Sequence, residues 1–462
     1  MPALHDFTTW EPLLTLLRAE YGGRAAAGTG HMTGSISSTG WRLKVLPRDE
    51  QFLARAAAPV QRALVEAGVR EAMFAADVSR DGRTVLHVFG TSPAMESRSG
   101  LRIPSPGTLV LVEDAVAEPW RRRPEPVPGA VPAPSADPAL LERTLRERLP
   151  DAVGATEEEI AAAEERLGVA LPEELRALYR ATRVSPVGPD GSGDWEADFA
   201  EQQAAESAVG CELGSLDSLF IADATLRPCP WRYAAVEAAV TPPDAAVQGL
   251  AGSPGWIAFG SNGGDHFAVD LTPGPGGHLG QVILIGHEEN IGAELYGDSL
   301  TELVLNRFES GAPEGHAVRQ ARATVRIGER PDPADLVSSA HPDLEVVEIL
   351  RRSGAPLSLA PVVGLPRLRT LTAHPGTLAD PLEIAGLTGL EYLGIGPDEW
   401  RVLLDAGAVP KGLSAVSVEV RGDEHPLTVV DVANDLLALW DRPPIARTSI
   451  EGHLPHPGVS GS

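Results

Sequence analysis

A proline-rich segment limits how this chain can divide into domains. Seven prolines fall within the twenty residues 119–138. Proline lacks a backbone N–H and fixes φ, so a run this dense cannot form a helix interior or a central strand. We therefore expect residues 116–138 to be a semi-rigid linker in an extended conformation. Because 462 residues exceed what one core holds, the linker predicts at least one folded domain on each side.

Residues 1–115 have the pattern of a small α+β domain of unknown family. Apolar residues recur at helical spacing in two stretches, and three others have the composition of strands, two of which flank a turn. The predicted helices are 9–17 and 52–68, and the predicted strands are 41–45, 72–78 and 84–89. No nucleophile with a matching base stands out in this region. An enzyme whose activity resides here is therefore the third of our functional hypotheses.

The chain is acidic, with a formal net charge of −26 at pH 7. The excess is concentrated in residues 151–310, where 27 Asp and Glu accompany seven Arg and no Lys. Such a surface repels nucleic acid and membrane phosphates and attracts cationic proteins, although a general acidic bias for solubility explains the charge equally well. No signal peptide or membrane-spanning apolar run is visible. We therefore expect a cytoplasmic protein with a protein partner and no nucleic-acid or membrane partner.

Residues 139–310 begin with sequence patterns for two short helices. Thr156 and Glu159 form a capping box, and Gly168 ends the first helix. Pro172 stands at the start of the second helix, where its missing N–H costs no hydrogen bond. Short apolar runs broken by glycine and proline follow, with a strong turn pattern at 261–265. These runs predict an antiparallel sheet packed with the helices.

Several strings of residues in this region resemble one known family. They are Thr156–Ile160, Glu164–Leu175, Ala177–Tyr179, Trp256–Gly260, Gly263–Asp265, Phe267–Leu271, Gly280–Val282 and His287-Glu288. Together they look like the SUKH superfamily, the bacterial relatives of the fungal SMI/KNR cell-wall regulators. The resemblance implies a non-catalytic α+β binding module, often an immunity protein that neutralises a polymorphic toxin. The chain departs from the family over 183–254: residues 183–188 stand where the family usually has an Asn-Gly pair, and a long alanine- and acid-rich stretch follows.

The acidic middle region supplies the candidate partner-binding residues. We expect a basic partner to contact carboxylates together with one tryptophan: Asp194, Trp195, Glu196, Asp198, Asp265, Asp270, Glu288 and Glu289. Histidines stand nearby at 266, 278 and 287, yet no His-x-x-x-His or Glu-x-x-His spacing occurs, and the two cysteines lack zinc spacing. We therefore predict no catalytic residue, no metal and no cofactor.

Residues 340–441 contain a weak leucine repeat. Apolar triplets recur with starting positions 24, 22 and 23 residues apart: Leu344, Val347 and Ile349; Leu368, Leu371 and Ala373; Leu390, Leu393 and Ile395; Leu413, Val416 and Val418. The period predicts a short leucine-rich-repeat-like α/β solenoid, because one unit cannot bury its apolar side alone. Coincidental spacing in an irregular α/β domain is the alternative. We expect residues 442–462 to be a disordered tail.

The predicted whole is a multidomain α+β protein, and it fits two functions besides an enzyme. The first is immunity-type neutralisation of a cationic toxin through the acidic surface. The second is a regulatory scaffold, related to the cell wall or to signalling, in which the repeat region binds a further partner. The chain is longer than a typical single-domain immunity protein, which favours the scaffold.

Overall fold

The computed structural model describes residues 3–21, 31–43, 50–96, 109–184, 195–227, 229–289, 291–306, 323–328, 336–420 and 424–455. The chain separates into two compact units. Unit 1 combines residues 1–115 with residues 325–462, and unit 2 comprises residues 116–324. The chain therefore leaves unit 1, forms unit 2 as an insertion, and returns.

Unit 1 contains an antiparallel N-terminal sheet of five strands in the order β17-β4-β3-β1-β2. The strands are β1 (His31–Ser37), β2 (Trp41–Leu43), β3 (Glu71–Val78), β4 (Arg83–Phe89) and β17 (Arg447–His453). Helices α1 (Phe7–Tyr21) and α2 (Glu50–Glu66) pack on one face, where Trp10, Leu13, Val60 and Phe74 are buried together. The helices and strands predicted for 1–115 thus lie close to their predicted positions; residues 44–49 are outside the described part of the chain.

Unit 1 also contains a C-terminal sheet of six strands in the order β12-β13-β14-β15-β16-β5. The strands are β12 (Thr324–Ile327), β13 (Val346–Ile349), β14 (Thr370–Ala373), β15 (Tyr392–Ile395), β16 (Ala415–Val418) and β5 (Leu109–Val112). The consecutive strands β13 to β16 pair in parallel, and Val347, Leu371, Leu393 and Val416 are Cα partners in turn. The apolar triplets that the sequence repeat aligned therefore lie side by side.

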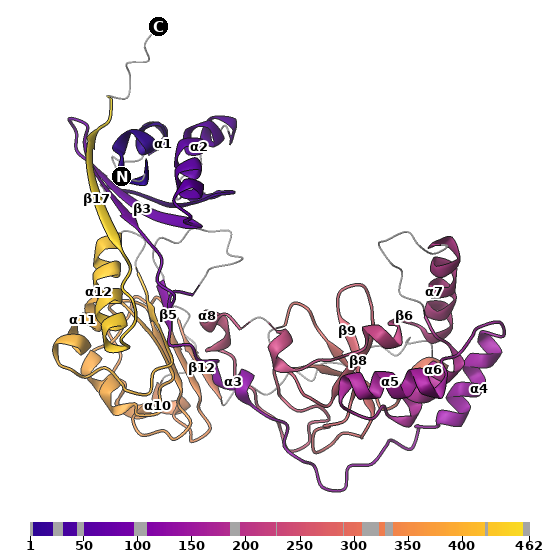
Figure 1. The fold of residues 1–462 in the computed structure, drawn as a ribbon. Helices are drawn as coiled ribbons and strands as arrows, with labels where there is room; N and C mark the ends of the chain where they lie inside the picture. Colours follow the sequence, from indigo (N-terminus) through magenta and orange to yellow (C-terminus); the bar gives the residue numbers. More distant parts are fainter. Residues whose placement is uncertain are drawn as a thin grey trace. The chain divides into compact units, whose positions relative to one another are not determined.

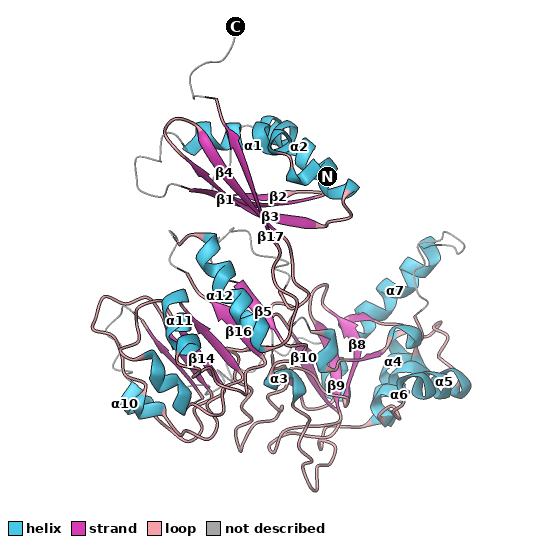
Figure 2. Cartoon of the chain, turned by 60° about the vertical axis from the view of Figure 1, so that its left-hand side comes forward, coloured by secondary structure: helices cyan, strands magenta, loops and turns pink. Residues whose placement is uncertain are grey.

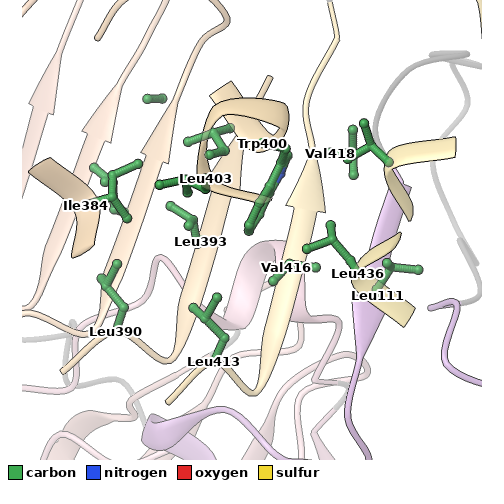
Figure 3. Close-up of a cluster of buried hydrophobic side chains, with 14 of the residues drawn as sticks. Leu111, Ile384, Leu390, Leu393, Trp400, Leu403, Leu413, Val416, Val418 and Leu436 are labelled. Atoms are coloured by element: carbon green, nitrogen blue, oxygen red, sulfur yellow. The ribbon is translucent and has the colours of Figure 1, made fainter. Parts of the chain in front are cut away.

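Helices cover the C-terminal sheet and complete its core. They are α10 (Leu336–Ser339), α11 (Pro397–Asp405) and α12 (Pro426–Leu439), with short 3-10 turns at Ala360–Val362 and Pro381–Gly386. Figure 3 shows Trp400 and Leu403 of α11 gathered with Leu393, Val416 and Leu436. These side chains belong to one buried cluster, so the parallel strands and the helices share a single core.

The two sheets of unit 1 exchange strands, which corrects two of the predicted boundaries. β5, from the N-terminal segment, pairs antiparallel with β16, and β17, from the C-terminal segment, pairs antiparallel with β4 (Figure 1). Residues 1–115 and 340–441 are therefore not separate domains. The predicted disordered tail is wrong over 447–453, which form a strand of seven residues; residues 456–462 lie outside the described part of the chain.

Unit 2 is built on a second antiparallel sheet, the middle sheet, in the order β11-β10-β9-β8-β6, with β7 also paired to β8. The strands are β6 (Glu212–Leu213), β7 (Phe220–Ile221), β8 (Trp256–Ser261), β9 (His266–Asp270), β10 (Gln281–Ile285) and β11 (Glu294–Gly297). Ile257, Phe259 and Val269 face the main core, whereas Trp256 and Ala268 face a second cluster. The middle sheet is thus buried on both faces.

Most of the described helices of unit 2 share one buried cluster with this sheet (Figure 2). They are α3 (Glu118–Arg121), α4 (Pro138–Arg148), α5 (Glu157–Leu167), α6 (Glu173–Ala181), α7 (Trp195–Val209), α8 (Trp231–Ala234) and α9 (Leu300–Leu305), with 3-10 turns at Leu216–Ser218 and Ala224–Leu226. Both hydrogen bonds of the predicted capping box at Thr156 and Glu159 are present, and Gly168 ends α5 with φ of 72°. The local sequence patterns therefore determine where α5 begins and ends.

The proline-rich segment is part of unit 2 and not a spacer between domains. It begins with α3, and its later residues contact loops of unit 2. The Gln248 side chain accepts from the Glu125 N–H and donates to the Glu125 carbonyl, both at 2.8 Å, and Leu279 N–H donates to the Val131 carbonyl at 3.0 Å. A polyproline-like chain keeps its carbonyls free, so it can bond to a neighbouring surface.

The protein is α+β and multidomain, as predicted, with helices packed on sheets that are largely antiparallel. Among the described helices, none is long and apolar enough to cross a lipid bilayer.

Candidate functional site

A tight turn at one end of the middle sheet holds the first of the predicted site residues. The turn joins β8 to β9 through residues 261–265, and Gly263 takes a φ of 94° that other residues rarely adopt. The Asn262 side chain accepts hydrogen bonds from the backbone N–H groups of Gly264 and Asp265, and it donates to the Asp265 carboxylate at 3.1 Å. The turn therefore fixes the direction of Asp265.

Asp265 is paired with a histidine from the next loop. The His287 backbone N–H and the His287 ring Nδ1 both lie against Asp265 Oδ1, at 3.0 and 2.8 Å. These bonds and the Asn262 amide lower the pKa of Asp265 to about 2, and the same contact raises the pKa of His287. The pair joins two loops at the edge of the domain, with 61% of the His287 side chain exposed.

Other carboxylates gather at this end through strand register. Ser261 is the Cα partner of both Glu212 and His266, and Leu284 is the partner of Glu294. Glu288 and Glu289 follow His287 in the loop and are exposed. We call the set Glu212, Asp265, Glu288, Glu289 and Glu294 the acidic sheet end.

The carboxylates of the acidic sheet end influence one another. Burial by its surroundings and the charge of Glu294 raise the pKa of Glu289, and Asp265 adds to that effect. Burial is the largest cause of the rise; the neighbouring carboxylates add negative charge around Glu289, and the Arg227 guanidinium offsets part of it. Glu288 is 89% exposed and points to solvent. A cation or a basic side chain placed there would relieve the repulsion.

Of the predicted residues, Asp265, Glu288 and Glu289 come together, whereas Asp270 does not. Asp270 lies at the opposite end of β9 and is fully buried, so its prediction as a partner-binding residue is wrong. Its carboxylate accepts from the Thr272 N–H at 2.7 Å, the Thr272 hydroxyl at 3.1 Å and the Gln281 amide at 3.0 Å. Asp270 therefore has a structural role in joining β9, β10 and the following loop.

Asp270 predicts a specific pH dependence. Burial raises its pKa to about 6, against the opposing hydrogen bonds from Thr272 and Gln281. Because the folded pKa lies above the unfolded value near 4, the folded state binds more protons between these limits, and stability falls as pH rises from about 4 to about 6. At about 1.4 kcal/mol per unit, the loss approaches about 3 kcal/mol. Urea unfolding of wild type and Asp270→Asn at pH 4 and pH 7 checks this.

The comparison isolates Asp270 because the amide introduced by Asp270→Asn does not titrate. The amide accepts less well from Gln281, which lowers the unfolding free energy of the variant. This loss is the same at pH 4 and pH 7, so it cancels when the two unfolding free energies are subtracted. Parallel stability profiles for the two proteins would contradict the assignment.

Three of the four remaining predicted residues lie at the start of α7. Asp194 is outside the described part of the chain, and Trp195, Glu196 and Asp198 belong to the first turn of α7, whose side chains are not described there. Further along α7, an open hollow is lined by Gln203, Glu206, Ser207 and Gly210. α7 leads directly into β6, which carries Glu212.

Glu212 and Glu294 were missed by the sequence prediction. Both reach the acidic sheet end through pairing of short strands, β6 with β8 and β11 with β10. A two-residue strand has no detectable period, so nothing in the local sequence around Glu212 indicates this pairing. For Glu294, the register shift between Val282 and Ile283 further obscures the partner.

Comparisons with known proteins match the middle of this chain. Residues 154–306 match the model of the SMI1/KNR4 family (SUKH-1). A glucan synthesis regulatory protein of Neurospora crassa is 42% identical over 67 residues, which cover 14% of this chain and 13% of that protein. A KNR4/SMI1 homolog of Eremothecium gossypii is 41% identical over 73 residues, which cover 15% of this chain and 11% of that protein. The chain therefore spans only a small part of these relatives.

The residues matched by the family model coincide closely with most of the helices and the sheet of unit 2. The matched residues begin just before the capping box of α5 and end just after α9, and they include every strand of the middle sheet. α4 precedes the match, but Leu141 and Leu145 of that helix are fully buried in the same core. Residues 154–306 of this chain are therefore an SMI1/KNR4 family (SUKH-1) domain, as the sequence resemblance predicted.

Proposed function

We propose that the SUKH-1 domain is a non-catalytic binding module that presents the acidic sheet end to a basic surface of a partner protein. The observation that carries the proposal is the convergence of five carboxylates from four separate segments at one end of the middle sheet. Four of the five are exposed, and Asp265 is half-buried. Clustered exposed carboxylates attract a basic partner over a distance set by the Debye length.

Electrostatics supports a protein partner over a polyanion. Residues 151–310 hold 27 acidic residues and seven arginines. Several of these arginines are already engaged within the domain: Arg176 and Arg180 bind Glu157 at 2.7 and 2.6 Å, and Arg183 binds Glu159 at 2.7 Å. The positive charge of these three arginines is thus neutralised within the helices, while at the acidic sheet end Arg227 offsets only part of the negative charge. Such an arrangement favours fast association with a cationic surface.

The His287–Asp265 pair supports binding more than catalysis. A histidine that acts as a base on a nucleophile needs its second nitrogen directed at that nucleophile. Here Nδ1 is held by Asp265, and Nε2 lies 4.0 Å from the Glu288 carboxylate. Two carboxylates around one imidazole stabilise its protonated form, so the ring serves to join the two loops.

In its more specific form the proposal is an immunity-type protein that occludes a cationic toxin domain. The SUKH resemblance supports this form, and the acidic sheet end would imitate the phosphates that a nucleic-acid-directed toxin binds. The first partner to test is the product of a neighbouring gene, because immunity and toxin genes act as pairs.

A regulatory scaffold is the second candidate, and two observations favour it. The relatives include a glucan synthesis regulatory protein of Neurospora crassa. Unit 1 adds four consecutive parallel strands with a spacing of 24, 22 and 23 residues, which we propose to be a leucine-rich-repeat-like stack able to hold a further partner. In this form the acidic sheet end binds one protein and unit 1 binds another.

Charge reversal at the acidic sheet end is expected to weaken partner binding strongly. The double variant Glu288→Lys/Glu289→Lys reverses two exposed charges without removing a described core contact. We expect this variant to lose at least a tenfold factor in affinity for the partner. We also expect wild-type binding to weaken steeply as salt rises from 50 to 300 mM, because salt screens interactions between exposed charges over about a Debye length. Titration calorimetry with the purified partner, or co-purification from cell extract, measures both effects.

The matched control is Glu158→Lys/Glu165→Lys, which makes the same charge change on exposed positions of α5. Equal losses in the two double variants would mean that only net charge matters, and binding unaffected by salt would contradict the proposal. The immunity-type form and the scaffold form of the proposal predict different results for the Glu288→Lys/Glu289→Lys variant. An immunity-type protein loses its one partner with the Glu288/Glu289 variant, whereas a scaffold keeps the partner bound by unit 1.

A further inference from the structure

Unit 1 contains a cluster of metal-ligating side chains that is separate from the SUKH-1 domain. His31 is the first residue of β1, Asp77 lies in β3, and His425 is the N-cap residue of α12. His31 and Asp77 are direct Cα partners across the two strands, so their side chains leave the same face of the N-terminal sheet. The start of α12 brings His425 onto that face. Three segments far apart in sequence therefore meet at one point.

The ligand atoms of these residues are close together. One ligand atom from each of His31, Asp77 and His425 lies within 4.8 Å of the other two. His425 Nε2 is 3.2 Å from Asp77 Oδ1 and 3.3 Å from Oδ2, and the rings of His31 and His425 are 4.7 Å apart between centroids. All three residues are only partly buried, so an ion can reach them from solvent.

A third histidine borders the cluster from the next strand. His87 of β4 faces Ala75, and Asp77 is two residues further along β3, on the same face of the sheet. His87 Nε2 is 3.5 Å from Asp77 Oδ2. Its other nitrogen, Nδ1, is 2.9 Å from the hydroxyl of Ser449 in β17, which directs Nε2 toward the cluster. Metal-ligating histidines commonly have their second nitrogen held in this way.

We propose that His31, Asp77 and His425 bind a transition-metal ion such as Zn²⁺, with His87 as a fourth ligand or as a hydrogen-bond partner of Asp77. Imidazole nitrogens and a carboxylate are a donor set that Zn²⁺ takes readily. Two ligands held at about 2.0–2.1 Å from a tetrahedral zinc ion lie about 3.3 Å apart, which is the separation already present between His425 and Asp77. The more distant His31 approaches by rotation about its side-chain torsions.

Binding through His425 has a defined cost. His425 Nδ1 accepts a hydrogen bond from the Leu427 N–H at 3.1 Å, so the proton is on Nε2. Coordination through Nε2 requires the other neutral tautomer of the ring: the proton leaves Nε2 and Nδ1 takes one up. No net proton is released, and the protonated Nδ1 can no longer accept the capping hydrogen bond from Leu427. In return the ion joins β1 and β3 of the N-terminal sheet to the start of α12. The ion would therefore stabilise unit 1 by linking segments from both ends of the chain.

The test uses the full chain, freed of any purification tag and stripped of metal with a chelator. We expect Zn²⁺ to bind with one equivalent at micromolar or tighter affinity in calorimetry, and Co²⁺ to give the visible absorption of a low-coordinate site with imidazole ligands. His31→Gln and His425→Gln should each weaken Zn²⁺ binding at least tenfold. His5→Gln, an exposed histidine of the same unit, should leave the affinity unchanged.

The Zn²⁺ titration of the wild-type chain tests the proposal by itself, even if a variant fails to fold. Absence of saturable Zn²⁺ binding to the wild-type chain would overturn it. So would binding of several weak equivalents, or one equivalent that survives in both His31→Gln and His425→Gln. Circular dichroism of each variant in chelator shows whether lost binding reflects lost ligands or lost structure.

Discussion

Ending the chain after Ala446 is expected to unfold the N-terminal sheet. The truncation removes β17, whose seven residues pair with all seven residues of β4. It also removes Ile450 and Leu454, which are buried in the same core as Trp10 and Leu13. Burial of each such side chain contributes about 1.5–3 kcal/mol, and each lost ladder hydrogen bond adds about 1 kcal/mol. The sum is comparable with the whole stability of a typical domain, about 5–15 kcal/mol.

The same truncation removes further contacts outside the sheet. Arg18 of α1 donates to the carbonyls of Leu454 and Pro455 at 3.0 and 3.1 Å. Gly452 packs so closely on Phe7 that a Cβ there would lie 2.2 Å from the ring. β17 and the two residues after it therefore contact α1 as well as β4.

Thermal unfolding and limited proteolysis measure the effect of the truncation. The control ends the chain after Pro455 and keeps every described residue of β17, so it should unfold like the full chain. If the shorter protein kept a native melting transition and protease resistance over residues 3–96, the pairing of β17 with β4 would be contradicted.

The second large effect is expected from Glu174→Ala in the SUKH-1 domain. Glu174 of α6 is only 8% exposed, and its carboxylate accepts from the Thr301 N–H at 2.9 Å and from the Thr301 hydroxyl at 2.5 Å. Thr301 lies in the first turn of α9 and also accepts from the Asp137 N–H at 3.1 Å. Removal of the carboxylate leaves a buried N–H of a helix terminus unsatisfied. We expect a loss of about 3 kcal/mol in unfolding free energy.

Glu173 provides a matched control one residue away. Its carboxylate is 58% exposed and bonds Arg180 at 2.7 Å on the surface. Glu173→Ala should cost less than about 1 kcal/mol, because exposed ion pairs are screened by water and salt. Glu174→Gln should restore part of the loss, since its amide oxygen can still accept from Thr301. Equal losses for Glu173→Ala and Glu174→Ala in urea unfolding would contradict this account.

Residues whose conformation depends on near neighbours were well predicted. The Thr156–Glu159 capping box, the αL residue Gly168 and the turn at 261–265 each need a few adjacent residues only, and the structure has all three. The family strings lie on these same elements. For that reason the SUKH-1 domain was identifiable from sequence, even though the matched relatives cover only a small share of the chain.

Burial of polar residues was predicted less well. Asp270 is a charged residue at the end of a strand, a position that is usually exposed. The middle sheet, however, has a packed cluster on each face, so successive residues of β9 are buried on alternate sides. A strand buried on both faces loses the polar alternation that marks an exposed face. The burial of Asp270 therefore depends on the loop that follows the strand and on Gln281. The sequence pattern of the strand does not indicate either contact.

The amino-acid order alone determined the helix ends, the turns, the spacing of the apolar triplets and the presence of a SUKH-1 domain, because each of these rests on interactions between residues near one another in the chain. Tertiary structure decided which segments are partners: β17 with β4, β5 with β16, the proline-rich segment with Gln248, and His31 with Asp77 and His425. Such pairings join residues up to several hundred positions apart. Their free energy comes from burial and hydrogen bonds that exist only once both sides are folded.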